Sequence, residues 1–140
     1  MGLDVELLRS SFALVTDRQP QLTLRFYEHL FEAHPELQPL FKSRTRDAQA
    51  QMLQEALVAV LDHLEDAPWL TDTLGSLGAR HQGYGVTPPM YDYVGEALLK
   101  TLAEAAGEDW SDALHQSWSD AYGAIRDMAL AGCDDRKATG

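Results

Sequence analysis

The sequence predicts an all-α domain of about seven helices joined by short connections. Apolar residues recur three and four positions apart along most of the chain, which is the spacing of one helix face. No stretch alternates apolar and polar residues for long enough to form a strand. The expected helices differ in length, so we expect them to cross obliquely and not to form an up-and-down four-helix bundle.

The composition is that of one globular domain. The chain has 140 residues, 45% of them hydrophobic and 24% charged, which is enough to bury a substantial core. Its net charge of −11 argues against nucleic-acid and anionic-membrane partners, because binders of either need a basic surface. Cys133 is the only cysteine, which excludes an intrachain disulfide and a cysteine metal cluster.

Targeting signals are not evident in the sequence. No apolar run reaches the ~18 residues of a membrane span. The N-terminus carries acids where a secretory signal would carry bases. We therefore expect a cytoplasmic protein, with a domain over residues 1–132 and a polar C-terminal tail over 133–140.

Two helices and a tight turn account for the first part of the chain. The first helix ends near Pro20 and the second follows it. Pro35 and Pro39 bracket a segment that is too short for more than a single tight turn and ends at Phe41. Residues 42–47 are polar and are expected to form a loop. The apolar faces of the two helices consist of Val5, Leu8, Phe12 and Val15, and of Leu22, Phe26 and Leu30.

Proline and glycine separate the helices of the second part. Thr87 followed by Pro88 is a helix-start signal, because threonine caps the first turn and proline fits its first position. We expect one helix to end before Pro68. Three further helices are expected from about Trp69 to Arg80, from Pro88 to Gly107, and from about Asp109 to Ala131.

The helix end at His81 is the strongest candidate for a site. Gly83 and Gly85 follow it, and both can adopt the left-handed backbone angles that stop a helix. A lone histidine at such an end is often only a partner for the helix dipole. Leu74 and Leu77 share its face, however, and an apolar face that ends in one imidazole suits haem, a large flat cofactor whose iron takes one histidine. Other residues whose spacing could bring them to the same cavity are Tyr27, Phe41, Gln49, Leu53, Leu57 and Tyr91.

The sequence gives no support for a phosphate-binding loop, a di-iron site or another metal site. The glycines follow a helix and not a strand, so they form no phosphate-binding loop. The sequence Glu-x-x-His does not occur, although a di-iron bundle needs it twice. The remaining histidines share no metal-ligand spacing, and we expect them on the surface or at helix ends: His29, His34, His63 and His115.

Four segments together carry a family resemblance. They are FYEHLFEAHPELQPLF at 26–41, LGARHQGYGV at 77–86, YDYVGEALL at 91–99, and Trp118 with Ala121-Tyr122. In this order they resemble bacterial single-domain globins, similar to the haem domain of flavohaemoglobins and to Vitreoscilla-type haemoglobin, over residues 3 to 131. The resemblance implies a three-over-three globin fold, with a short or absent helix between the third helix and the long distal helix.

The resemblance also implies roles for single residues. His81 would ligate the iron of haem b, and Phe41 would pack against the haem. Tyr27 would be the distal tyrosine, with Gln49 and Leu53 one turn apart on the long helix. The position of Gln49 depends on the length of the loop after Phe41, and the alternatives are Gln51, Met52 and Leu53. Further haem contacts implied by the resemblance are Leu57, Leu77, Val86, Tyr91 and Val94.

The implied function is reversible binding of dioxygen and of other diatomic gases such as NO and CO. Tyr27 and Gln49 would each donate a hydrogen bond to the bound gas. Alternatives are a nitric oxide dioxygenase that works with an external reductase, a gas sensor that signals to a partner, and a globin-like fold that has lost haem. We expect no flavin or nicotinamide domain, and either a monomer or a homodimer.

One position departs from the family pattern. Flavohaemoglobins resemble one another in a glutamate on the last helix near the proximal histidine. Counting from Trp118, Cys133 stands at about that position here, and the nearest acid is Asp134. Because a carboxylate partner makes a ligating histidine more basic, its absence argues against peroxidase-like or fast dioxygenase chemistry.

Overall fold

The computed structural model describes residues 4–41, 45–83 and 85–139, and it describes side chains as far as Gly132. This part of the chain consists of α-helices and two 3-10 helices, without a strand. The bounds are α1 Val5–Arg18, α2 Leu22–Ala33, η1 Pro35–Phe41, α3 Arg46–Asp62, α4 Ala67–Gly83, α5 Pro88–Ala106, η2 Gly107–Asp109 and α6 Asp112–Thr139. The all-α prediction is confirmed.

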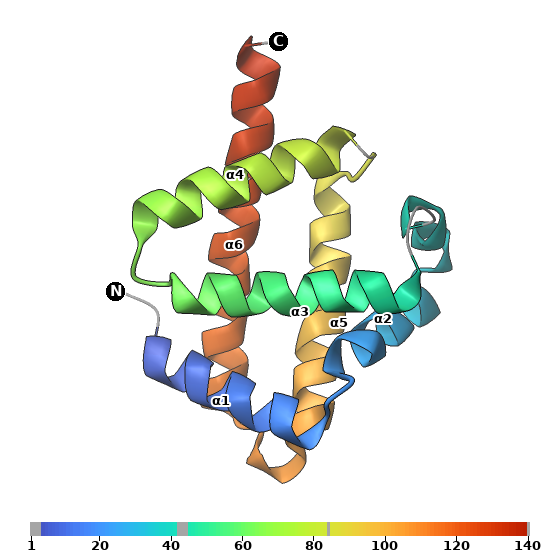
Figure 1. The fold of residues 1–140 in the computed structure, drawn as a ribbon, viewed down its shortest axis with the longest axis vertical. Helices are drawn as coiled ribbons and strands as arrows, with labels where there is room; N and C mark the ends of the chain where they lie inside the picture. The colour runs from blue at the N-terminus through green and yellow to red at the C-terminus, as the bar shows by residue number, and fades with distance from the viewer. Residues whose placement is uncertain (1–3, 42–44, 84, 140) are drawn as a thin grey trace.

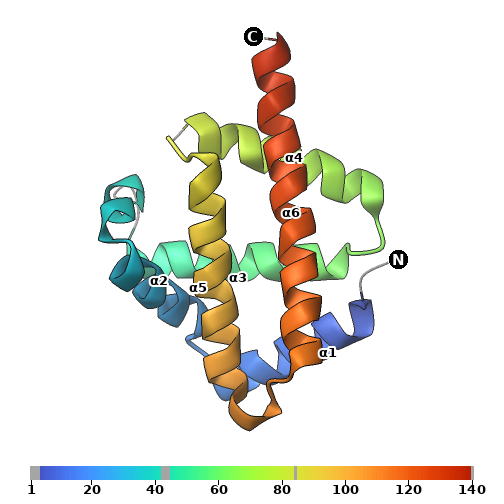
Figure 2. The same ribbon diagram turned by 180° about the vertical axis from the view of Figure 1, so that it is seen from behind.

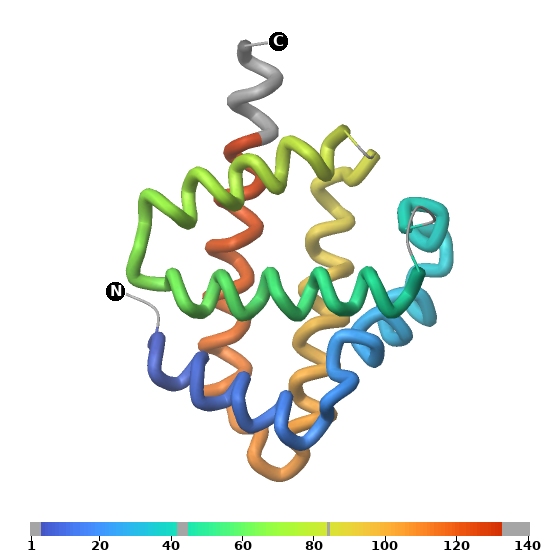
Figure 3. Tube along the Cα trace, in the orientation of Figure 1, coloured from blue at the N-terminus to red at the C-terminus, as the bar shows by residue number. Residues whose placement is uncertain are grey.

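The helices form two crossing layers. Figures 1 and 2 show α5 and α6 lying side by side, with α3 and α4 crossing the same face of this pair. The trace in Figure 3 shows α1 crossing near the opposite end of α6 from α4. Within the described residues, no helix is long and apolar enough to cross a membrane.

The start of α3 differs from the sequence prediction. Thr45 caps this helix, because its Oγ1 accepts a hydrogen bond of 3.1 Å from the N–H of Ala48. The helix therefore begins at Arg46, inside the segment 42–47 that was expected to be a loop. Residues 42–44 of that segment lie outside the described part of the chain.

The end of α4 also differs. The helix was expected to stop at His81, but it continues to Gly83. Of the two glycines expected to end it, only Gly85 has a left-handed backbone, with φ of 95°. Pro68 lies inside the first turn of α4 and not before it, a position that tolerates proline because the N–H there has no partner within the helix.

The last helix begins later and ends later than predicted. Gly107 ends α5 with φ of 57°, as expected, but a short 3-10 turn follows and α6 starts only at Asp112. The backbone of α6 then remains helical to Thr139, through the segment predicted to be a tail. The side chain of Cys133, and with it the departure from the family pattern, lies outside the described residues. The domain limit at residue 132 stays a prediction.

Two glycines allow α4 to lie directly on α6. A Cβ at Gly78 would overlap the backbone of Ala129, and a Cβ at Gly132 would overlap the backbone of Gly75. Only residues without a side chain permit such a close approach of two helices. Because His81 is one turn beyond Gly78, this crossing determines where the histidine stands relative to α6.

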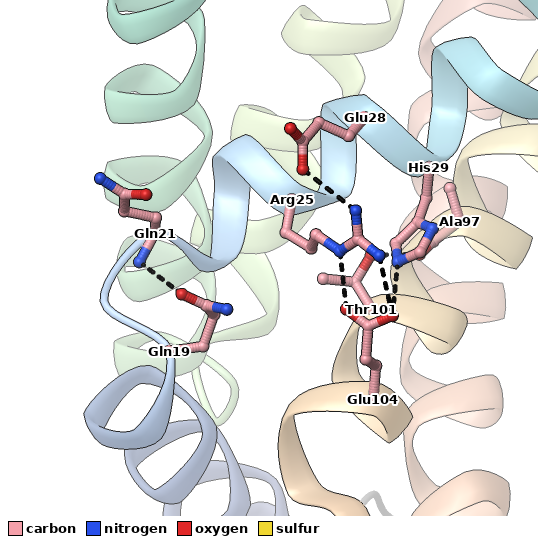
Figure 4. Close-up of polar contacts among 8 residues, drawn as sticks. All are labelled: Gln19, Gln21, Arg25, Glu28, His29, Ala97, Thr101 and Glu104. Carbon is pink, nitrogen blue, oxygen red and sulfur yellow. Dashed lines mark hydrogen bonds and ion pairs between the residues drawn. The ribbon is translucent and has the colours of Figure 1, made fainter.

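A polar cluster joins α2 to α5 (Figure 4). Arg25 donates to both carboxylate oxygens of Glu104, at 2.7 and 3.1 Å, and this hydrogen bonding holds the pKa of Glu104 below its usual value. His29 Nε2 lies 3.2 Å from Glu104 Oε2. His29 is only 5% exposed, so the expectation of a surface or helix-end position is wrong for this histidine. The cluster fixes α2, which also carries Tyr27, against α5.

Candidate functional site

A cavity of about 210 Å³ lies among the helices. Packed protein interiors rarely contain voids larger than one water molecule, ~30 Å³, so this cavity is too large to be a packing defect. Its walls are almost entirely apolar, and they come from α2, η1, α3, α4, α5, α6 and the connection between α4 and α5. An apolar space with few polar groups is typical of a cofactor or small-molecule site.

Nine residues predicted from the sequence line this one cavity. They are Tyr27, Phe41, Leu53, Leu57, Leu77, His81, Val86, Tyr91 and Val94. Helices that are far apart in the sequence supply them, so the structure brings together residues that the sequence analysis assigned to one site. Their contacts with a cofactor stay a prediction.

Gln49 does not line the cavity. It is half-buried on α3, one turn before Leu53. Of the alternatives, Leu53 lines the cavity, whereas Gln51 and Met52 are exposed, Met52 by 46%. The side of α3 that faces the cavity is apolar throughout and consists of Leu53, Ala56, Leu57 and Val60. The structure therefore supplies no polar side chain from α3 to the cavity wall.

His81 is held in one tautomer. Its Nδ1 lies 2.8 Å from the carbonyl oxygen of Leu77, one turn back in α4. A carbonyl only accepts hydrogen bonds, so Nδ1 must carry the proton and donate it. Histidines that ligate a metal commonly donate one ring N–H to a backbone carbonyl in this way, which leaves the other ring nitrogen, here Nε2, as the one that can face a metal. The α4 backbone thus fixes the orientation of the imidazole.

Tyr27 lies in an aromatic cluster. Its ring centroid is 5.0 Å from that of Phe26, 5.8 Å from that of Phe31 and 5.5 Å from that of Phe41. Burial raises the pKa of Tyr27 to about 12, so the hydroxyl is neutral at pH 7. Among residues 4–41, 45–83 and 85–139, no hydrogen bond engages this hydroxyl. Tyr27 therefore offers the cavity a hydrogen-bond donor.

The wall from α6 was largely missed by the sequence analysis. It consists of Trp118, Tyr122, Ile125 and Ala129, which are spaced four, three and four residues apart. This spacing is one helix stripe, so the periodicity of the last helix could have identified it. Other lining residues that were not assigned to the site are Phe26, Leu30, Leu37, Leu40, Ala56, Val60, Met90 and Leu98.

The cavity suits a group that brings its own metal. The described residues contain no cluster of three or more histidine, cysteine or acidic side chains that could hold a metal ion. One imidazole can supply only one ligand, so a metal at this position would need further ligands from a bound group. A flat, mainly apolar metal complex satisfies both the single nitrogen donor and the apolar walls.

Comparisons with known proteins agree with this arrangement. The model of the family described as Globin matches residues 24–129. The chain is 30% identical over 129 residues to a flavohemoprotein of Bacillus anthracis, covering 91% of this chain and 32% of that protein. It is 30% identical over 131 residues to a flavohemoprotein of Rhizobium meliloti, covering 92% of this chain and 32% of that protein. The chain thus spans about a third of the length of these curated relatives.

Solved structures show the same fold. A bacterial globin from Campylobacter jejuni superposes with a TM-score of 0.80 and covers 96% of this chain and 96% of its own. The two sequences are 20% identical. A likeness at this identity concerns the arrangement of the helices and not the chemistry of the site.

Proposed function

Because the chain belongs to the globin family, we propose that its cavity holds haem b with His81 as the iron ligand. The proposal rests on the His81 imidazole. Its Nδ1 faces the carbonyl oxygen of Leu77, and the ring lines a cavity with apolar walls. Haem would supply an iron coordination position for diatomic gases, namely dioxygen, NO and CO. Reversible gas binding is the function that these residues support best.

Tyr27 would stabilise a polar gas in the cavity. Its hydroxyl is buried, neutral at pH 7 and available to donate a hydrogen bond. One such hydrogen bond contributes about 1 kcal/mol net, which corresponds to roughly a fivefold gain in affinity. Gln49 does not line the cavity, so we assign no second hydrogen bond to it. Tyr27 would therefore discriminate polar from less polar gases.

The apolar face of α3 favours binding over chemistry. Leu53, Leu57 and Val60 offer no group that could take up or release a proton. They also reduce the access of water to the cavity. Tyr27, with a pKa of about 12, is poorly suited to proton transfer near pH 7.

A nitric oxide dioxygenase working with an external reductase is the second candidate. The observation that favours it is the match to about a third of each flavohemoprotein, a class of protein longer than this chain. Nitrate formation from NO with an added reductase would distinguish it from simple gas binding. A cytoplasmic location and a monomer or homodimer stay predictions for either candidate.

The proposal is tested by adding hemin to the purified protein and recording its absorption spectrum, as prepared and after reduction under CO. We expect a strong Soret band that sharpens with CO and collapses in His81→Ala. His63→Ala is the matched control. His63 Nδ1 also bonds a carbonyl one turn back, that of Ala59 at 2.7 Å, but its ring stacks on Trp69 and does not line the cavity.

Two results would contradict the proposal. The first is a wild-type protein that takes up no hemin. The second is a His81→Ala variant whose spectrum equals that of His63→Ala, because the iron would then be held by some other residue.

A further inference from the structure

Tyr122 of α6 covers the first turn of α5. Its hydroxyl donates a hydrogen bond of 2.6 Å to the carbonyl oxygen of Tyr91. Its ring lies against Gly95, where an added Cβ would be 2.7 and 2.8 Å from two ring carbons. Those distances are shorter than side chains tolerate, so the ring needs glycine at this position. Tyr122 is therefore closely fitted to α5 through both its ring and its hydroxyl.

A second contact holds the same turn. Arg126, one turn further along α6, pairs with Asp92 at 2.9 Å between Nη1 and Oδ1. Tyr91 and Asp92 are consecutive residues of α5, and consecutive turns of α6 hold them. Because Asp92 and Arg126 are partly exposed, this pair is the weaker of the two contacts.

The held turn is the one that follows His81. The connection from Gly83 to Pro88 is short, and the N–H of Val86 donates to the carbonyl of His81 at 3.0 Å. The first turn of a helix has no preceding turn to fix it, and this turn contains two prolines that contribute no N–H donor. Its position therefore depends on contacts from outside α5, and α6 supplies them.

We propose that Tyr122 is a positioning residue of the haem site, which acts by fixing the backbone of Tyr91 and thereby the wall of the cavity next to His81. Tyr91, Tyr122 and His81 all line the same cavity. A shift of the first turn of α5 would move Tyr91 within the wall and would pull on the His81 carbonyl through Val86. This inference rests on the proposed haem function.

The experiment compares Tyr122→Phe with Tyr93→Phe, both loaded with haem. Tyr122→Phe keeps the ring on Gly95 and removes only the hydroxyl that reaches Tyr91. Tyr93 is also on α5 and partly buried, but it stacks on His34 and does not line the cavity. Two quantities are measured: the iron–histidine stretching band of the ferrous protein by resonance Raman spectroscopy, and the rate of haem transfer to an excess of a haem-free scavenger protein.

We expect Tyr122→Phe to shift or broaden the iron–histidine band and to raise the rate of haem loss about two- to tenfold, the fold-change that corresponds to one net hydrogen bond. Tyr93→Phe should change neither quantity. If Tyr122→Phe does not fold, Arg126→Gln removes the other contact to the same turn and should shift the band in the same way, by a smaller amount.

The outcomes separate the two proposals. A wild-type protein that takes up no haem contradicts the proposed function. A wild-type protein that takes up haem, with a Tyr122→Phe band and haem-loss rate equal to those of wild type, overturns only the positioning role. A Tyr122→Phe protein that loses thermal stability without any change in the band also overturns it, because Tyr122 would then stabilise the fold and not orient His81.

Discussion

At Tyr27, burial decides what the side chain can do. Removal from water raises its pKa to about 12, which means that the fold favours the neutral form. This contribution to stability is complete below the ordinary tyrosine pKa of ~10 and is lost as the pH rises through about 12. At neutral pH the hydroxyl therefore keeps its proton and can donate a hydrogen bond, as the proposed role requires.

Tyr27→Phe should raise the rate of dioxygen dissociation about fivefold and change that of CO little, because bound dioxygen carries more negative charge and loses one hydrogen bond of ~1 kcal/mol. Flash photolysis and stopped-flow mixing measure the two rates. Gln49→Leu is the control and should change neither, since Gln49 does not line the cavity. Equal changes for both gases in Tyr27→Phe would exclude this role.

Gln49 was harder to place from the sequence than the other site residues, and its role toward a bound gas stays a prediction. Tyr27, Phe41 and His81 lie in segments whose amino-acid sequence resembles the family pattern, so their positions could be assigned directly. Gln49 follows a polar loop of uncertain length, and a shift of one residue turns a helical side chain by 100°. Which face of α3 meets the cavity depends on the cap at Thr45, a tertiary detail that the spacing of apolar residues did not determine.

At the scale of the helix, the crossing of α4 over α6 depends on the absence of side chains. Gly78 leaves no room for a Cβ against the backbone of Ala129, and a rigid backbone cannot move aside as a side chain can. The crossing keeps α4, and His81 at its end, in a fixed place.

Gly78→Ala should lower the free energy of unfolding by about 1–3 kcal/mol, the usual cost of overpacking a closed interface. Urea denaturation followed by circular dichroism measures it. Gly83→Ala is the matched control on the same helix, because a Cβ there would meet no atom within 4 Å, and it should change stability by less than about 1 kcal/mol. A Gly78→Ala protein as stable as Gly83→Ala would mean that the two helices can separate without cost.

Helix positions were more predictable than helix ends. The periodic apolar faces located α1, α2, α3, α4, α5 and most of α6, because burial of one face favours the same residues whatever the neighbour is. The ends depended on local capping at Thr45, on a 3-10 turn before α6, and on Gly85 in place of Gly83. The close approach of the glycines at the α4–α6 crossing was not predicted, since nothing in the sequence shows what lies opposite them.

For the whole molecule, the cavity lowers the stability of the folded state, and a ligand that fills it raises that stability again. Its apolar walls lack packing partners on one side, which reduces the dispersion attraction of the folded state. Haem at 100 times its dissociation constant should add about 2.7 kcal/mol to stability. The unfolding midpoint should then rise by roughly 10 °C on haem binding, which calorimetry of the haem-free and loaded proteins measures. Identical midpoints would mean that haem does not bind the folded state preferentially.

The cavity walls begin at Phe26 and end at Ala129. During synthesis the chain leaves the ribosome from its N-terminus, so helices α1 to α5 emerge before the last wall exists. The His81 side of the cavity is incomplete until α6 has docked onto α4 and α5. The proposed cofactor can therefore be enclosed only after Ala129 has left the ribosome, and a nascent chain arrested before Ala129 should expose the apolar side chains of the cavity walls to chaperones.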